Sequence, residues 1–139
     1  MNDSEKVLVK YEPYFRNDIT RLIAAKEGLS PQAVVDFLSL SGLPQQLVKQ
    51  VFNTSIKTFR RYLRQNKLLN ASTSEKLLRL YALYQRGLIV FGSAEAFTEW
   101  LMKPAFGIGN LVPLTILDTA TGIKLINEEL VRIANGDLA

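Results

Sequence analysis

The side chains best placed to do chemistry in this sequence are cations gathered in one stretch. Between Asp36 and Glu75 there is no acidic residue. The same window holds six basic residues: Lys49, Lys57, Arg60, Arg61, Arg64 and Lys67. A local positive field of this kind attracts polyanions, and nucleic acid is the usual one. The alternative is a solvated basic face with no partner.

The spacing of apolar residues predicts that a helix from about Ser55 to Gln65 carries most of these cations. At 100° per residue, Ile56, Phe59 and Leu63 define one face of this helix. Its other face and flanks hold the candidate DNA-binding residues: Thr54, Lys57, Thr58, Arg60, Arg61, Arg64, Gln65 and Lys67. Central Arg and Lys side chains can reach guanine, Gln and Thr can meet adenine or thymine, and flanking cations can lie near phosphates. The alternative is an amphipathic core helix with a cationic solvent face.

A second short helix is predicted just before the basic one. It begins at Leu43-Pro44, turns Leu47, Val48 and Val51 inward, and ends at a turn over residues 52–55. Two short helices joined by three or four residues, the second one basic, indicate a helix-turn-helix. The turn contains no glycine, although such turns often do.

Missing residue types exclude most catalytic chemistries. The chain has no Cys and no His, so it has no thiolate nucleophile, no imidazole base, no Ser-His-Asp triad and no ordinary zinc site. A Gly-x-Gly run occurs at 107–109, but without a preceding strand or a following Lys it does not predict a phosphate loop. We therefore expect a protein that is not an enzyme and needs no metal or cofactor. The remaining alternative is a small enzyme using Asp118, Lys124 or Glu128.

Length and composition indicate a folded domain without a membrane segment. The chain has 139 residues, 47% of them hydrophobic, and a net charge of +4, which fits one domain or two small helical subdomains. No apolar run is long enough to span a bilayer. The first residues, 1–6, carry acids where a secretory signal would be basic. We expect a cytoplasmic protein.

Two further helices are predicted on the N-terminal side of the basic segment. Residues 7–11 are expected to form a short strand or an extended arm, because Pro13 argues against a helix there. A helix from about Arg16 is capped by Gly28. Its expected inward residues are Ile19, Leu22, Ile23 and Ala25. Ser30-Pro31 then opens a helix. Its expected inward residues are Val34, Val35 and Leu38.

Capping and breaker residues predict three more helices after the basic segment. Residues 72–75, with sequence Ser-Thr-Ser-Glu, form a capping box for a helix that ends at Arg86 and Gly87. Ser93 caps the next helix, Pro104 stops it, and Pro113 begins a single turn. Phe97, Trp100 and Leu101 form the apolar patch of this middle helix.

The last predicted helix is capped by Thr121 and ended by Gly136. Its inward residues are Ile123, Ile126, Leu130 and Ile133, and its outward residues are Lys124, Glu128, Glu129 and Arg132. Together these elements predict an all-α chain: an N-terminal helix-turn-helix domain over residues 1–70 and a small helical domain over residues 71–139.

The order of residues in the last third of the chain resembles a known family. The matching features are Phe91-Gly92, Trp100-Leu101, Pro104 with Gly107 and Gly109, Pro113 with Ile116-Leu117, and Asp118-Thr119 with Gly122. This pattern is similar to the toxin-binding domain of Xre/MbcA/ParS-type antitoxins, the partners of RES-domain toxins. The chain departs from it at residues 105–109, where many relatives have a polar residue and a Leu-Gly-Gly run. Members of the family carry an Xre-like helix-turn-helix ahead of this domain. The helix-turn-helix predicted here, which contains the basic segment, has the same position.

The resemblance implies a function and a set of partners. A member of this family would neutralise a RES-type, NAD-consuming toxin, bind operator DNA to repress its own operon, and form a homodimer. The toxin contact is expected in the exposed loop, the last helix and the chain end: Phe106, Ile108, Lys124, Glu128, Arg132, Asp137, Leu138 and Ala139. The acidic end of the chain would enter a cationic nucleotide pocket, or be a frayed terminus with no role. The alternative function is a stand-alone helix-turn-helix regulator with a C-terminal dimerisation domain.

Overall fold

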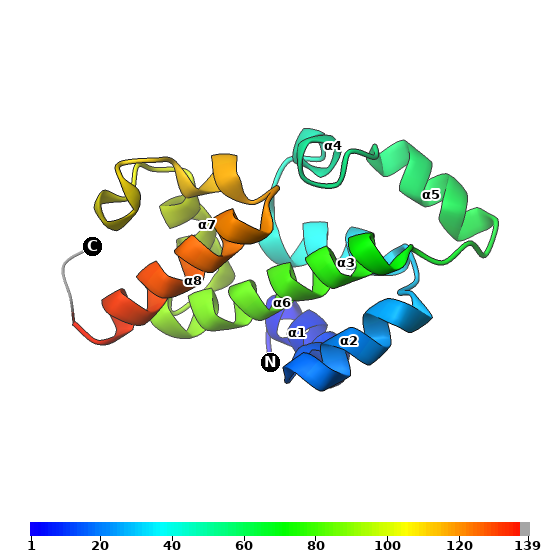
Figure 1. Cartoon of the computed structure of the whole chain (residues 1–139), viewed down its shortest axis with the longest axis horizontal. Coiled ribbons are helices and arrows are strands. Elements are labelled where there is room, and N and C mark those ends of the chain that lie inside the picture. The colour runs from blue at the N-terminus through cyan, green and yellow to red at the C-terminus, as the bar shows by residue number, and fades with distance from the viewer. Residues whose placement is uncertain (137–139) are drawn as a thin grey trace. The chain divides into compact units, whose positions relative to one another are not determined.

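The computed structural model describes residues 1–136, and these form helices and turns without a β-strand (Figure 1). The α-helices are α1 (Asp3–Phe15), α2 (Asp18–Glu27), α3 (Gln32–Ser41), α4 (Gln46–Phe52), α5 (Ile56–Arg64), α6 (Ala71–Phe91), α7 (Ala94–Leu101) and α8 (Ala120–Ala134). Two 3₁₀ helices, η1 (Phe106–Ile108) and η2 (Pro113–Ile116), lie between α7 and α8. None of the described helices is long and apolar enough to cross a membrane. The expected all-α class is confirmed.

The chain divides into two compact units, Met1–Ala82 and Leu83–Ala139, and the division falls inside α6. Helix α6 therefore contributes residues to both units. Along its middle, six side chains are at most 1% exposed: Leu77, Leu78, Leu80, Tyr81, Leu83 and Tyr84. The predicted domain boundary after residue 70 would keep α6 whole in the C-terminal part, and it stays a prediction.

Residues 3–15 form a helix, so the expected strand or arm at the N-terminus is wrong. The Asn2 side chain caps α1 by accepting a hydrogen bond from the Glu5 backbone N–H at 2.9 Å. Pro13 lies in the last turn, where the N–H it lacks would have bonded the carbonyl of Val9. Both residues are exposed, so water can take that hydrogen bond. The helix is held by burial of Leu8, Tyr11 and Phe15, which outweighs the proline.

Of the four residues of α2 that were expected to face inward, only Ala25 is buried, and the buried side of the helix lies opposite the other three. Only two alanines of this helix, Ala24 and Ala25, are buried, whereas Ile19, Leu22 and Ile23 are 71%, 50% and 52% exposed. The predicted cap is confirmed: Gly28 has a φ of +88° and its N–H bonds the Ala24 carbonyl at 3.0 Å.

Tyr81 of α6 lies at the centre of the first unit. Its ring stacks on Tyr11 at 4.6 Å between centroids and meets Phe37 edge-on at 5.4 Å. Its hydroxyl donates to the Ala33 carbonyl at 2.7 Å. Helix α3 therefore buries Phe37 along with Ala33 and Val34, and the expected inward residues Val35 and Leu38 are only partly buried.

Three donors converge on the Asp36 carboxylate of α3. Lys10 Nζ donates at 2.9 Å and Gln32 Nε2 at 3.0 Å, and the Tyr11 hydroxyl donates a short hydrogen bond. Burial by itself would raise the pKa of Asp36, but these hydrogen bonds outweigh burial and hold the pKa below its usual range. Burial also raises the pKa of the Tyr11 hydroxyl, which stays protonated as the donor.

The α2–α3 turn and the α5–α6 turn are joined by hydrogen bonds. The Leu69 N–H donates to the Leu29 carbonyl at 2.8 Å. The Leu29 N–H donates to the buried Ser74 hydroxyl at 3.0 Å. Helix α6 is capped by Asn70, whose side chain accepts from the Thr73 N–H at 2.8 Å, so the predicted cap at Ser72 is wrong by two positions.

Gly87 lies inside α6 and does not end it as predicted. A Cβ at this position would lie 2.3 Å from the ring of Phe97, so the glycine admits that ring against the helix backbone. The helix continues to Phe91, and Gly92, with a φ of +91°, follows it. The predicted cap at Ser93 is confirmed by a 3.1 Å hydrogen bond from the Ala96 N–H.

The last helix begins two residues earlier than predicted. The Thr119 hydroxyl accepts from the Gly122 N–H at 2.9 Å, so Thr119 and not Thr121 is the cap. A Cβ at Gly122 would lie 1.7 Å from the Ile116 carbonyl oxygen, so only glycine allows η2 to approach this closely. Ile123, Ile126 and Leu130 are buried as predicted.

We predict that Asp36→Asn lowers the free energy of unfolding at neutral pH by about 1–3 kcal/mol, because charge-assisted hydrogen bonds are lost. The folded-state pKa of Asp36 is lowered, so its contribution is present above the unfolded value, about 3.9, and is lost as pH falls through the folded value. The stability difference between variant and wild type should therefore shrink below about pH 4. Urea unfolding at several pH values measures it, with exposed Glu99→Gln as the control. An undiminished difference at acid pH would contradict the prediction.

Candidate functional site

The predicted helix-turn-helix is formed by α4 and α5, and asparagine supplies the turn that glycine often makes. Asn53 has a φ of +55°, and its N–H bonds the Lys49 carbonyl at 2.9 Å. Asparagine tolerates this left-handed conformation. Ser55 then caps α5 by accepting from the Thr58 N–H at 3.2 Å. A turn without glycine is therefore compatible with this motif.

Helix α5 is anchored by its apolar face. Phe59 is 2% exposed and meets Phe52 of α4 edge-on at 5.9 Å between centroids. Ile56 and Leu63, the other expected inward residues, are partly buried. The Lys76 ammonium of α6 donates to the Val51 carbonyl at 2.9 Å, at the C-terminal end of α4. A cation is favourable there because the last carbonyls of a helix carry partial negative charge.

The candidate DNA-binding cations lie on the opposite side of α5 and are exposed to solvent. The exposed residues are Lys57, Arg60, Arg61, Arg64, Gln65 and Lys67. None of these cations forms an ion pair with a carboxylate in the described part of the chain. Thr54 and Thr58 are only partly exposed, and the Thr58 hydroxyl accepts from Ser55 Oγ at 3.1 Å. The structure thus offers charge and hydrogen-bond donors along one face of a short helix.

Tyr62 orders the C-terminal part of this cationic face. Lys67 Nζ lies over its ring at 4.2 Å from the centroid, and the Arg61 guanidinium lies at 5.5 Å. Cation–π contacts of this kind restrain long side chains without neutralising them. The charges stay available to a polyanion.

A groove beside the start of α5 was not predicted from the sequence. It has a volume of about 230 Å³ and is lined by Gln45, Gln46, Lys49, Ser55 and Ile56. Lys49 is therefore on the same side as the N-terminal end of α5, the end that meets base edges in helix-turn-helix complexes. No sequence pattern marks Gln45 and Gln46 as part of a groove, so these residues could not be predicted.

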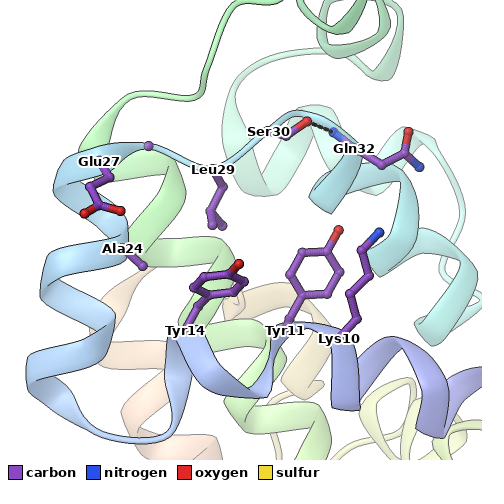
Figure 2. A pocket seen from close by; sticks show the side chains of 9 residues that line it. Lys10, Tyr11, Tyr14, Ala24, Glu27, Leu29, Ser30 and Gln32 are labelled. Atoms are coloured by element: carbon purple, nitrogen blue, oxygen red, sulfur yellow. Dashed lines mark hydrogen bonds between the residues drawn. The ribbon is translucent and has the colours of Figure 1, made fainter.

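A larger cavity of about 440 Å³ lies between α1 and the α2–α3 turn. Figure 2 shows the rings of Tyr11 and Tyr14 side by side, with their hydroxyls toward the segment that carries Leu29 and Ser30. Lys10 and Tyr11 already bond Asp36, so their polar atoms are engaged.

In the C-terminal unit, η1 and its flanking residues present one aromatic side chain to solvent. Phe106 is 72% exposed, while its neighbours Ala105 and Ile108 are buried at 4% and 7%. The loop is closed by hydrogen bonds from the Ala105 N–H to the Leu111 carbonyl and from the Asn110 N–H to the Ala105 carbonyl, both 3.0 Å. Ile108 therefore anchors the loop in the core, and its side chain is no part of an exposed toxin surface.

A buried carboxylate fixes this loop against α8. Glu129 is fully buried, so its expected outward position is wrong. Arg132 Nε donates to Glu129 Oε1 at 2.8 Å, and its Nη2 donates to the Gly107 carbonyl at 3.3 Å. A Cβ on Gly107 would lie 1.9 Å from Glu129 Oε2, an oxygen with no hydrogen-bond partner in the described residues. The sequence predicts Glu129 on the outer face of the helix because a charged residue is seldom fully buried.

The other predicted toxin-binding residues are distributed over α8 and the chain end. Lys124 and Glu128 are exposed and form a loose ion pair at 3.9 Å. The Arg132 side chain is 41% exposed, but its guanidinium is engaged with Glu129 and Gly107. Asp137, Leu138 and Ala139 lie outside the described residues.

The fold and its two surfaces define a helix-turn-helix protein with a small helical C-terminal domain. Residues 21–81 match the antitoxin Xre-like helix-turn-helix domain, and residues 86–136 match the antitoxin Xre/MbcA/ParS C-terminal toxin-binding domain. The chain therefore carries two domains that match those of Xre/MbcA/ParS-type antitoxins, as its resemblance in sequence indicated.

Two curated relatives agree with this family. One is named Prs ADP-ribosylating antitoxin, from a Sphingobium species, and is 24% identical over 135 residues, covering 91% of this chain and 85% of the relative. The other is named Antitoxin Xre, from Pseudomonas putida, and is 28% identical over 81 residues, covering 58% of this chain and 51% of the relative. Both names describe antitoxins.

We predict that Gly107→Ala destabilises the chain by about 1–3 kcal/mol, because its Cβ would overlap the Glu129 carboxylate. Urea unfolding followed by circular dichroism measures the change. The matched control is the same substitution in a Glu129→Ala background, where the overlapping group is gone. There the added cost of Gly107→Ala should fall by at least about 1 kcal/mol. Additive effects would show that the carboxylate does not restrain the loop.

Proposed function

We propose that this chain is an antitoxin that neutralises a RES-type, NAD-consuming toxin through its C-terminal part and represses its own operon through α5. The observation that carries the proposal is the pairing of two surfaces in one chain. One is a helix whose exposed cations have no described carboxylate partner, and the other is an aromatic side chain held out by a braced loop. The matches to antitoxin domains support the proposal that the chain is an antitoxin. The resemblance in sequence supports the choice of a RES-type toxin.

The DNA-binding half rests on the placement of α5. Lys57 in the first turn of α5 and Arg61 in its last turn would reach base edges in the major groove, with Thr54, Thr58 and Gln65 as further hydrogen-bonding groups. Arg60, Arg64 and Lys67 lie where phosphates would pass and would add affinity that salt weakens. A homodimer would present two copies of α5 to two half-sites of an operator.

The toxin-binding half rests on the rigidity of the Phe106 loop. An aromatic side chain that is already ordered before binding loses little conformational freedom in a complex, and such residues dominate interface energies. The exposed Met102 and Leu111 extend the apolar surface on the same short segment. Lys124, Glu128 and the outer edge of Arg132 would form a polar rim, and the acidic chain end would supply charge to the toxin's nucleotide pocket.

Co-expression with the protein encoded beside this gene, which the proposal expects to be of RES type, tests the whole proposal. An antitoxin would co-purify with that protein in a fixed ratio and abolish its NAD consumption. A chain that binds operator DNA but holds no second protein would be a stand-alone regulator instead.

We predict that Arg61→Glu abolishes specific binding to the operator, because it replaces a base-reaching cation by a repelling charge. Arg64→Ala should weaken binding to all sequences alike and reduce the slope of log K against log salt by about 1. Fluorescence anisotropy across a salt series measures both. Exposed Arg86→Glu on α6 changes net charge as much as Arg61→Glu does and should leave operator affinity within about twofold. Equal losses for Arg86→Glu and Arg61→Glu would mean that net charge, and not α5, governs binding.

We predict that Phe106→Ala weakens toxin binding about 30-fold, as expected when an aromatic anchor is removed. The exposed Phe106 contributes little to the core, so helix content should stay unchanged. Deleting residues 137–139 should release toxin activity while leaving DNA binding intact. Calorimetry with the purified toxin and an NAD-consumption assay measure these effects, with Ile89→Ala, an exposed position on α6, as the control. If only the deletion acts, the toxin contact lies in the chain end and not in the loop.

A further inference from the structure

Helix α2 exposes its large apolar side chains and buries its small ones. At 100° per residue, Ile19, Leu22, Ile23 and Lys26 form a continuous stripe on the side opposite to the two buried alanines. We call these four residues the α2 stripe. A surface helix of a monomeric protein normally has the reverse arrangement. Exposed apolar surface of this kind, flanked by charges, marks a protein–protein contact.

We propose that the α2 stripe is a homodimer interface in which two copies of α2 pack antiparallel about a two-fold axis near Leu22 and Ile23. The charges that border the stripe are self-complementary in this orientation, and the other cation of the helix, Arg21, forms an ion pair with Asp18 on the side away from the stripe. Asp18 lies at the N-terminal end, on the Leu22 side of the stripe, and Lys26 lies at the C-terminal end. Asp18 of each copy would face Lys26 of the other copy. The interface would therefore contain two equivalent Asp18–Lys26 pairs, as an isologous interface requires. Glu27 falls on the other flank, beside Ile23.

The antiparallel orientation also places each positive helix N-terminus near the negative C-terminus of the other copy. A parallel pair would instead bring Asp18 against Asp18 and Lys26 against Lys26. The stripe has a single cation, so DNA is a poor occupant. Asp18 and Glu27, both exposed at its flanks, disfavour an anionic lipid surface.

The surface beside the stripe can supply further contact area. A stable interface buries about 800 Å² on each partner, more than one short helix face offers. Glu27, on the Ile23 flank of the stripe, borders the 440 Å³ cavity, and the half-exposed Tyr14 of α1 borders it as well (Figure 2). The interface would extend from the stripe toward this tyrosine. The inference deepens the proposed homodimer and depends on the proposed function only for the expectation of two copies.

Sedimentation equilibrium of the full chain tests the surface. Ile23→Lys should weaken dimerisation on the order of 100-fold, because it places a charge at the centre of an apolar contact on both copies. Leu68→Lys, at a position that is 55% exposed and outside α2, should leave the dimer unchanged. Both positions are exposed, so circular dichroism should show the same helix content for both variants.

A charge exchange tests the orientation. Asp18→Lys and Lys26→Asp should each weaken the dimer about tenfold, because each makes two like-charge contacts. An equimolar mixture of the two variants should restore association, because every lysine in the mixed dimer then faces a carboxylate. Failure of the mixture to associate overturns the antiparallel arrangement.

A chain that stays monomeric at all concentrations, or a dimer that Ile23→Lys does not weaken, overturns the interface. If Ile23→Lys abolishes toxin capture and leaves the dimer unchanged, the stripe binds the toxin, and the proposed homodimer interface is overturned. Toxin capture retained by a monomeric Ile23→Lys variant supports the interface. Toxin capture and operator binding of the wild-type chain are measured separately, so failure of the interface is distinguishable from failure of the proposed function.

Discussion

The first compact unit depends on the Tyr81 side chain. Its ring lies among aromatic residues of α1 and α3, and its hydroxyl bonds the carbonyl of Ala33. This hydrogen bond ties α3 to α6, and the Asp36 carboxylate one turn later ties α3 to α1 through Tyr11. Helix α5 packs on α3, so the helix that carries the exposed cations rests on an element that this buried tyrosine holds in place. Burial raises the pKa of Tyr81, which keeps its proton for the hydrogen bond.

The all-α fold, the helix-turn-helix and the cationic face of α5 could be predicted from the sequence because each rests on local signals. Ser55 and Ser93 cap helices through hydrogen bonds to residues three positions away, and periodicity alone separates Phe59 from Arg61. Two caps, predicted at Ser72 and Thr121, were misplaced by two residues, and the larger errors occur where distant contacts decide. On α2 the alanines and the larger aliphatics form two competing apolar faces, and only tertiary packing selects between them. Gly87 and Gly107 resemble helix and turn breakers, but each is required by a partner far away in sequence, Phe97 and Glu129.

The two proposed binding surfaces have opposite physical character. The α5 surface consists of long, flexible cations whose contribution is electrostatic, graded and sensitive to salt. The Phe106 surface is a single aromatic group on a loop closed by backbone hydrogen bonds and braced by Arg132 and Glu129. The first suits a polyanion that can be approached in many registers, whereas the second suits one protein partner with a complementary pocket. One short chain can carry both because each surface is built from residues of its own compact unit.

The hydrogen bonds that Leu29 forms with Leu69 and Ser74 have an evolutionary consequence. They hold the two ends of the intervening segment next to each other, and Ser74 fastens one of those ends to α6. Because the ends are fixed, a change of length or sequence in the turns around α4 need not be transmitted to the helices on either side. The entropic cost of a longer closed segment grows only slowly with its length. Selection can therefore alter the segment proposed to face DNA while the framework beneath it stays constant.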